Sequence, residues 1–318
     1  MMAKTGAAPR LAPQDAFEAD ACEGLNSEPK WLAPKYFYDA AGSALFEQIT
    51  KLPEYYPTRT ELALLTGRGP ELAEALGPGC VLIEFGAGSG LKAELLLKSL
   101  EAPAGYAAIE ISQTALAATA ARLAAAFPKL PIRLIEADFS AGEALPQGLP
   151  AGRRVGFFPG STIGNMTPKE AEAFLAARRR MLGPGAAFLA GVDLAKDPAI
   201  LLPAYDDAAG VTARFNLNLV TRLNRELGAG LDPAGFRHEA RWNAAESRIE
   251  MHLVATKAQT ARIAGRAIHF RQGESIHTEN SYKYEPAQFE ALAARAGWRL
   301  LRRVTDAQDW FGLFLLAN

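Results

Sequence analysis

Few folds can accommodate the segment at residues 82–92, which reads LIEFGAGSGLK. Its apolar first half has the length and composition of a buried strand. Three alternating glycines, Gly86, Gly88 and Gly90, then let the backbone turn tightly and approach a ligand closely. The helix that we expect from Leu91 onward presents free N–H groups and a positive dipole end to that ligand. The segment therefore predicts the first strand, turn and helix of a parallel α/β sheet with a binding cleft.

An acidic residue ends the next apolar run. The segment YAAIEIS places Glu110 about one strand after the glycine turn, where a carboxylate can accept hydrogen bonds from both hydroxyls of a ribose. The turn and this carboxylate together predict a nucleoside-binding cleft, because their spacing matches a βαβ unit. The alternative is a structural glycine turn with a surface glutamate, which that spacing disfavours.

The length of the glycine turn indicates which nucleoside is bound. Its pattern is G-x-G-x-G, whereas a dinucleotide pyrophosphate is bound by G-x-G-x-x-G. The shorter turn resembles that of the class I S-adenosylmethionine (SAM) methyltransferases, whose ligand has an amino-acid tail in place of phosphates. Further on, LIEADFS places Asp138 and Phe139 at the end of another strand, suited to the N6 amine and ring face of adenine. A dehydrogenase is the alternative, and the loop length argues against it.

Composition limits the classes of protein that this chain can belong to. Its 318 residues are 49% hydrophobic, enough for two domains or one elaborated domain. The formal net charge of −1 gives no sign of a nucleic-acid or anionic-membrane partner. The two cysteines, Cys22 and Cys80, lack the spacing of metal ligands and suit a reducing cytoplasm. Residues 1–15 lack the apolar core of a signal peptide and are expected to form a flexible tail. We expect a cytoplasmic protein without a metal.

The order of apolar and helical segments predicts two domains. From residue 80 to 192 strands alternate with helices, which predicts a parallel sheet with right-handed crossovers and ligands at the carboxyl ends of its strands. The carboxyl-terminal residues predict a helix and a closing pair of strands. We therefore expect an α/β, Rossmann-like class I methyltransferase domain from 61–195 and 287–318. An inserted α+β substrate-binding domain is expected from 1–60 and 196–286.

Three segments outside the glycine turn are dense in polar and aromatic residues, and they read PKYFYDAAGSALFEQITKLPEYYPTRTE, FFPGSTIGN and IHTENSYKY. In the third segment, Glu279 and Ser281 project to one face if the segment is a strand. A carboxylate and a hydroxyl at this spacing can bind both nitrogens of an imidazole, one as acceptor and the other as donor. A solvated strand face is the alternative, and from spacing alone the two interpretations are equally supported.

These three segments and AYDDAAGVTARFNLN together resemble the L-histidine Nα-methyltransferases of ergothioneine biosynthesis. The resemblance runs from about Pro29 to the carboxyl terminus, and FYDAAGSALF, LPEYYPTR and FPGSTIGN are its specific strings. It implies SAM-dependent conversion of L-histidine to its Nα,Nα,Nα-trimethyl betaine, hercynine, with SAM as co-substrate and no metal.

The same resemblance implies roles for individual residues. The residues implied to contact SAM are Gly86, Gly88, Lys92, Glu110, Asp138 and Phe139. Those implied to hold histidine are Tyr55, Gly160, Asn165, Tyr205, Met251, Glu279 and Ser281, and Tyr38 is implied to lie near the reacting amine as the catalytic residue. Two other functions stay open: methylation of another amino acid or small amine, and SAM binding without catalysis. The expected partner is a small molecule, with no nucleic acid or membrane, and we expect a monomer.

Overall fold

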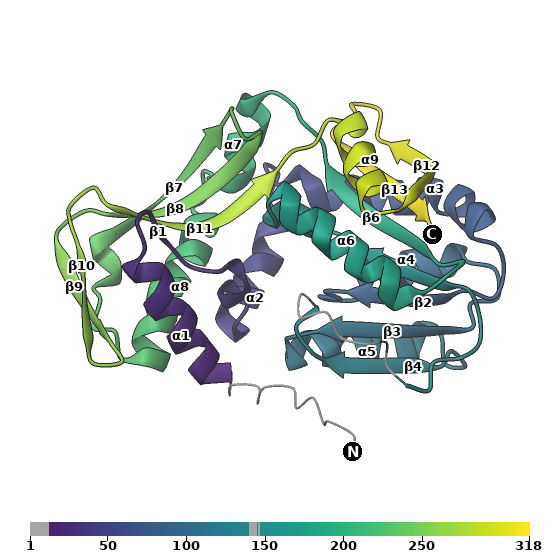
Figure 1. The fold of residues 1–318 in the computed structure, drawn as a ribbon, viewed down its shortest axis with the longest axis horizontal. Helices are drawn as coiled ribbons and strands as arrows, with labels where there is room; N and C mark the ends of the chain where they lie inside the picture. Colours follow the sequence, from purple (N-terminus) through teal and green to yellow (C-terminus); the bar gives the residue numbers. More distant parts are fainter. Residues whose placement is uncertain (1–12, 140–144, 146) are drawn as a thin grey trace, which may run out of the picture. The chain divides into compact units, whose positions relative to one another are not determined.

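The computed structural model describes residues 13–139, 145 and 147–318. The segment 1–12, most of the expected flexible tail, therefore lies outside the described residues. The chain forms two compact units, which we describe separately (Figure 1). The large unit comprises Glu47–Ala208, Trp242–Ile249 and Asn280–Asn318, and the small unit comprises Met1–Phe46, Ala209–Arg241 and Glu250–Glu279.

The large unit is built on a seven-stranded sheet with the order β12-β13-β6-β5-β2-β3-β4. Its strands are β2 (Val81–Phe85), β3 (Gly105–Glu110), β4 (Ile132–Glu136), β5 (Arg154–Phe158), β6 (Ala187–Asp193), β12 (Arg299–Thr305) and β13 (Phe311–Ala317). Strands β2 to β6 pair in parallel, and β13 runs antiparallel to both β6 and β12. The parallel part has the doubly wound order 3-2-1-4-5, which places a topological switch between β2 and β5.

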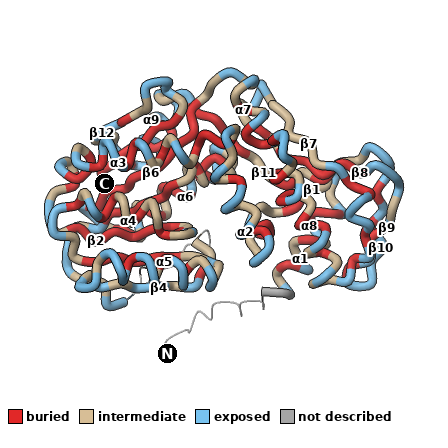
Figure 2. The backbone as a smooth tube through the Cα atoms, turned by 180° about the vertical axis from the view of Figure 1, so that it is seen from behind, coloured by how far each residue is buried: buried red, intermediate tan, exposed pale blue. Residues whose placement is uncertain are grey.

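Helices cover both faces of this sheet. They are α3 (Tyr56–Leu76), α4 (Leu91–Ser99), α5 (Gln113–Ala126), α6 (Pro168–Leu182) and α9 (Pro286–Arg295). The large unit also contains α7 (Pro198–Tyr205). Strand β2 shows why two layers form, since Val81, Ile83 and Phe85 pack with α6 and α9 whereas Leu82 packs with α3, α4 and α5. Both sides of the strand are therefore buried, as its continuous apolar run predicts (Figure 2).

The expected class I methyltransferase sheet is confirmed by this strand order and its helical layers. The closing hairpin that the sequence predicts is also present, because helix α9 is followed by β12 and β13, which pair antiparallel. Gly86, Glu110 and Asp138 follow or end parallel strands β2, β3 and β4, so they lie at the carboxyl edge of the sheet. Ligands of doubly wound sheets bind at this edge.

The small unit combines helices with a four-stranded sheet and an antiparallel hairpin. Its elements are α1 (Pro13–Asn26), β1 (Lys30–Trp31), the 3-10 helix η1 (Pro34–Phe37), α2 (Ala40–Ile49), α8 (Val211–Leu227), η4 (Pro233–Gly235), β7 (Phe236–Asn243), β8 (Arg248–Ala255), β9 (Gln259–Ile263), β10 (Arg266–Phe270) and β11 (Ser275–Tyr282), some of which continue into the large unit. The sheet order is β1-β11-β8-β7, and β9 pairs with β10 as an antiparallel hairpin. The expected α+β character of the inserted segment is present.

The boundaries of the two units differ from those expected for the two domains. Residues 47–60, 196–208, 242–249 and 280–286 were expected in the substrate-binding domain, and the structure groups them with the large sheet. Tertiary contacts explain this grouping, because helix α3 packs on β13 and Lys283 pairs with Asp193 at the end of β6. Which unit binds the substrate stays a prediction. Among the described residues no helix is both long and apolar enough to cross a membrane.

Candidate functional site

The glycine turn after β2 has the backbone geometry that its residues allow. Gly86, Gly88 and Gly90 have φ values of +78°, +53° and +71°, in the left-handed region that favours glycine. A Cβ atom on Gly90 would lie 3.0 Å from the side chain of Thr119, and one on Gly86 would lie 3.3 Å from the ring of Phe139. Both the conformation and the close neighbours therefore require glycine at these two positions.

Glu110 lies beside this turn. Its carboxylate accepts hydrogen bonds from the backbone N–H of Ser112 at 2.9 Å and of Gly88 at 3.4 Å. These bonds hold the carboxylate at the carboxyl end of β3, next to the start of α4. The structure thus brings together the glycine turn, a helix N-terminus and a carboxylate, the three features that the sequence predicts for a nucleoside site.

Phe139 contributes an aromatic face to the same edge. Its ring packs edge-on against Phe158 at a centroid distance of 5.4 Å, and it is the side chain closest to Gly86. Asp138 precedes it and is partly exposed, two residues beyond the end of β4. The sequence predicted this placement, which puts an aromatic ring directly beside the glycine turn at the carboxyl edge of the sheet.

Lys92 makes a contact that the sequence analysis missed. Its ammonium pairs with the carboxylate of Glu61 at 2.6 Å, and Glu61 is completely buried. The same carboxylate accepts the backbone N–H of Gly160 at 3.0 and 2.9 Å. Glu61 therefore joins the helix after the glycine turn to the FFPGSTIGN loop. A lysine has three N–H donors, so one ammonium can pair with Glu61 and still donate to a ligand carboxylate.

The FFPGSTIGN loop passes close to the backbone at the end of β11. Gly160 and Ser161 both have positive φ, at +81° and +55°. A Cβ on Gly164 would lie 2.9 Å from the carbonyl oxygen of Tyr282, so only glycine permits this approach. Asn165 ends the short 3-10 helix η3 (Thr162–Asn165) and is partly exposed. The loop thus offers an amide at the same carboxyl edge of the sheet.

The start of the next helix agrees with the sequence. Thr167 caps α6, its hydroxyl accepting the N–H of Glu170 in a reciprocal capping box, and Pro168 follows it. The expected cap is therefore confirmed.

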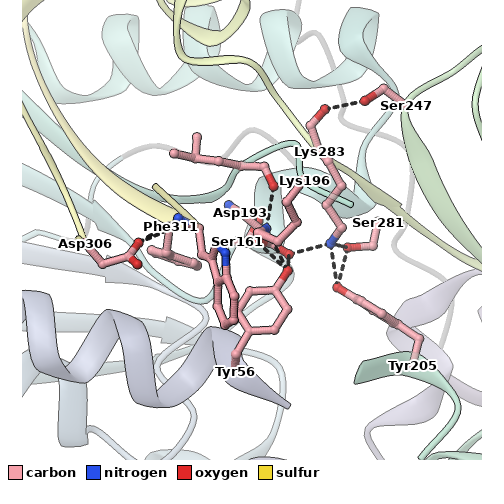
Figure 3. A network of polar contacts seen from close by, with 12 residues as sticks. Tyr56, Ser161, Asp193, Lys196, Tyr205, Ser247, Ser281, Lys283, Asp306 and Phe311 are labelled. Carbon is pink, nitrogen blue, oxygen red and sulfur yellow. Dashed lines mark hydrogen bonds and ion pairs between the residues drawn. The ribbon is translucent and has the colours of Figure 1, made fainter. Parts of the chain in front are cut away.

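A buried ionic network lies at the end of β6 (Figure 3). Asp193 is completely buried, and its two oxygens accept from Lys196 and Lys283 at 2.6 Å each. The hydroxyl of Tyr56 donates to the same carboxylate at 2.7 Å, and Lys196 donates to that hydroxyl at 2.8 Å. The backbone N–H of Asp193 donates to Ser161 at 2.9 Å, which ties the network to the FFPGSTIGN loop.

The charges of this network follow from its surroundings. Burial alone would raise the pKa of Asp193, but the ammonium groups of Lys283 and Lys196 outweigh burial and hold that pKa below its ordinary value. Burial lowers the pKa of Lys196 to about 8, against the opposing effect of Asp193. Burial and the nearby Asp193 raise the pKa of Tyr56 well above its usual value, so this hydroxyl stays protonated.

Lys283 connects the network to two of the expected histidine-binding residues. Its ammonium donates to Tyr205 and to Ser281 at 2.7 Å each, and these two hydroxyls lie 2.7 Å apart. Tyr55 packs edge-on against Tyr205 at a centroid distance of 6.3 Å. The structure therefore groups Tyr55, Tyr205 and Ser281, which lie far apart in the sequence.

Three expected site residues belong to the small unit. Tyr38 packs edge-on against Phe46 and Phe215, at centroid distances of 5.6 and 5.8 Å. Met251 is 2% exposed, and its carbonyl accepts the hydroxyl of Thr278 at 3.0 Å. Glu279 is partly buried near the end of β11. Tyr38 is thus in an aromatic cluster and Met251 in the core of its unit.

The small unit also contains a cluster of potential metal ligands. Glu250, His252 and His277 place one ligand atom each within 4.8 Å of one another. The rings of His252 and His277, however, stack at 4.9 Å with an interplanar angle of 18°. The lone pairs of an imidazole lie in the ring plane, so two stacked rings do not direct them at one ion. Burial lowers the pKa of His252 to about 4, and its ring nitrogen lies 3.0 Å from Glu250.

Comparison with known proteins identifies the family. The description "Histidine-specific methyltransferase, SAM-dependent" matches residues 17–318. The chain belongs to this family. Its histidine N-alpha-methyltransferase relatives include one from Mycolicibacterium smegmatis, 43% identical over 96% of this chain and 97% of the relative. The corresponding protein from Mycobacterium tuberculosis is 42% identical over 95% of each chain.

A fungal relative adds a second context. Ergothioneine biosynthesis protein 1 of Neurospora crassa is 30% identical over 91% of this chain and 33% of its own length. The resemblance to the histidine methyltransferases that the sequence strings predict is confirmed by these matches. The match also confirms that the chain is a member of a SAM-dependent enzyme family.

Proposed function

We propose that this protein transfers methyl groups from SAM to the α-amine of L-histidine and forms hercynine, the trimethyl betaine, in ergothioneine biosynthesis. The observation that carries the proposal is the family match over residues 17–318, together with relatives more than 40% identical along nearly their whole length. The glycine turn, Glu110 and Phe139 at one edge of the sheet supply a suitable nucleoside site.

On the donor side, the proposal assigns the SAM ribose to Glu110 and its adenine to Asp138 and Phe139. Gly86 and Gly88 allow close approach of the methionine part, and Lys92 is proposed to pair with its carboxylate. The ion pair between Lys92 and Glu61 supports this role, because Glu61 fixes the ammonium near the start of α4.

On the acceptor side, the proposal assigns Tyr55, Gly160, Asn165 and Tyr205 to the amino-acid backbone of histidine. Asn165 can donate its amide N–H to the carboxylate while its oxygen faces the amine, and tyrosine hydroxyls can donate to the same carboxylate. Glu279, Ser281 and Met251 are assigned to the imidazole and Tyr38 to the neighbourhood of the amine. For these four residues the support is the resemblance of their segments to the family.

The chemistry needs positioning more than covalent participation of the protein. SAM supplies an electrophilic methyl carbon on a sulfonium. The neutral α-amine attacks this carbon in line, the carbon–sulfur bond breaks, and S-adenosylhomocysteine leaves. Holding two reactants in near-attack geometry can contribute about 7–11 kcal/mol. Aromatic side chains near the amine, such as Tyr38, can stabilise the growing ammonium charge by about 0.5–2 kcal/mol. Cytoplasmic location, a monomeric state and the absence of a metal remain predictions from the sequence.

Mass spectrometry of histidine incubated with the protein and SAM tests the proposed reaction. We expect products heavier by one, two and three methyl groups, ending in the trimethyl form, and no product when S-adenosylhomocysteine replaces SAM. A panel of other amino acids and small amines in the same assay tests the alternative acceptor. Tight SAM binding without turnover on any acceptor would contradict the proposal and favour a non-catalytic SAM-binding protein.

Selectivity for histidine is expected to depend on Glu279. Glu279→Ala removes the proposed acceptor of the imidazole N–H, so we expect histidine affinity to fall by about 10- to 100-fold, or about 1–3 kcal/mol. SAM affinity should be unchanged in the same variant. Glu279→Gln is the matched control, since its amide oxygen keeps an acceptor and should retain part of the affinity. Unaltered histidine binding by calorimetry in Glu279→Ala would show that the imidazole assignment is wrong.

A further inference from the structure

The ammonium of Lys283 holds a position that the proposed function leaves unexplained. Lys283 is 1% exposed and follows directly after β11. It donates to Asp193 at 2.6 Å and to the hydroxyls of Tyr205 and Ser281 at 2.7 Å each (Figure 3). An ammonium has three N–H groups, and these three bonds use one each. Burying such a charge is costly unless it is paired and hydrogen-bonded, and here both conditions hold.

The two hydroxyls are constrained by sharing this donor. Each oxygen accepts from Lys283, so neither hydroxyl can direct its own proton at the ammonium. Tyr205 and Ser281 also lie within hydrogen-bond distance of each other, where one donates and the other accepts. When both hydroxyls donate their hydrogen bonds to a ligand, each oxygen still accepts a hydrogen bond from Lys283. A hydrogen bond from a charged donor also polarises the hydroxyl and strengthens it as a donor.

We propose that Lys283 is a positioning residue of the methyl-acceptor site, which fixes Tyr205 and Ser281 as hydrogen-bond donors toward the amino-acid substrate. This inference rests on the proposed function, in which Tyr205 binds the substrate carboxylate and Ser281 binds its imidazole. One buried ammonium then aligns the donors for both ends of histidine. Asp193 holds the ammonium in place through their ion pair at 2.6 Å, and the hydroxyl of Tyr56 donates to both oxygens of this carboxylate.

Lys196 provides a matched control for this role. It pairs with the same carboxylate at the same distance of 2.6 Å and lies over the ring of Tyr56. Its hydrogen bonds in the described part of the chain go to Tyr56, Asp193 and Leu194, and none goes to Tyr205 or Ser281. Removing either lysine disturbs the Asp193 network, but only Lys283 contacts the two hydroxyls.

Calorimetry with histidine in the presence of S-adenosylhomocysteine tests the proposal. We expect Lys283→Met to weaken histidine binding at least about tenfold, or about 1.4 kcal/mol, with the affinity for S-adenosylhomocysteine unchanged. Lys196→Met should keep histidine affinity within about twofold even if its thermal midpoint falls. Should Lys283→Met not fold, Lys283→Gln replaces it in the same comparison.

A variant cycle tests whether Lys283 acts through the two hydroxyls. In a Tyr205→Phe, Ser281→Ala background, adding Lys283→Met should change histidine affinity by less than about twofold, because the groups that it positions are gone. The proposal would be overturned if Lys283→Met lowered histidine affinity as much in that background as in the wild-type protein. It would also be overturned if Lys196→Met lowered histidine affinity as much as Lys283→Met does. If the wild-type protein binds histidine and Lys283→Met binds it with the same affinity, this inference alone is overturned. Wild-type protein that does not bind histidine would overturn the proposed function and this inference with it.

Discussion

Glu84 is a buried acid in the middle of an apolar strand. It occupies β2, is 1% exposed, and accepts a hydrogen bond from the hydroxyl of Tyr106 on the neighbouring strand β3. Burial raises the pKa of Glu84 to about 8, against the opposing effects of Tyr106 and Lys92. The side chain is therefore mostly neutral at pH 7, two residues before the glycine turn.

This pKa makes the stability of the protein depend on pH. Between pH 4.5 and about 8 the unfolded chain releases the proton of Glu84 while the folded protein retains it, so the free energy of unfolding falls as pH rises. Glu84→Gln mimics the neutral acid and removes this dependence. We therefore expect the stability of Glu84→Gln relative to wild type to be greater at pH 9 than at pH 5, by at least about 1.4 kcal/mol in free energy of unfolding. Thermal midpoints of both proteins over this pH series measure the difference.

Exposed Glu101 serves as the control for this prediction, because Glu101→Gln removes a negative charge without a buried site. Its thermal midpoint should differ from that of wild type by a nearly constant amount over the same pH series. A constant difference for Glu84→Gln as well would show that Glu84 is ionised in the folded protein at neutral pH.

At the scale of single elements, strands and their ends were predictable, and partners across the fold were not. The apolar runs of β2 and β3 give their positions and the residues that follow them. In β11, however, the alternation of burial holds only to Glu279, after which Asn280 is partly exposed and Ser281 is buried. The simple two-residue period therefore does not describe the end of this strand, where two expected site residues lie.

The unpredicted part of the site consists of long-range polar pairs. Lys283 meets Asp193 across 90 positions of sequence, and Gly160 meets Glu61 across 99. Local patterns determine which residues end a strand, but such pairings depend on how distant segments close on the sheet. One signal was available for Asp193, since it ends an apolar strand as Glu110 does.

At the scale of the whole molecule, the order of elements in the sequence predicted the class of sheet. Five strands alternate with helices and a final hairpin closes the edge, so a parallel sheet with right-handed crossovers was predictable. The spatial order of the strands, and with it the switch point between β2 and β5, comes from the structure. The boundaries between the two units did not follow in the same way. Segments on either side of the insertion, such as 47–60 and 280–286, pack with the sheet through tertiary contacts that no local pattern reports.

The stability of the whole chain should report which nucleoside it binds. A ligand that binds the folded protein alone stabilises it by RT ln(1 + [L]/Kd), about 2.7 kcal/mol at a concentration of 100 Kd. We expect S-adenosylhomocysteine to raise the thermal midpoint in a concentration-dependent way and NAD to leave it unchanged, because the G-x-G-x-G turn differs from the pyrophosphate-binding pattern. Glu110→Ala should weaken the effect of S-adenosylhomocysteine, since it removes the proposed acceptor for the ribose hydroxyls. Protection by NAD without protection by S-adenosylhomocysteine would place the chain with dehydrogenases and contradict the donor site.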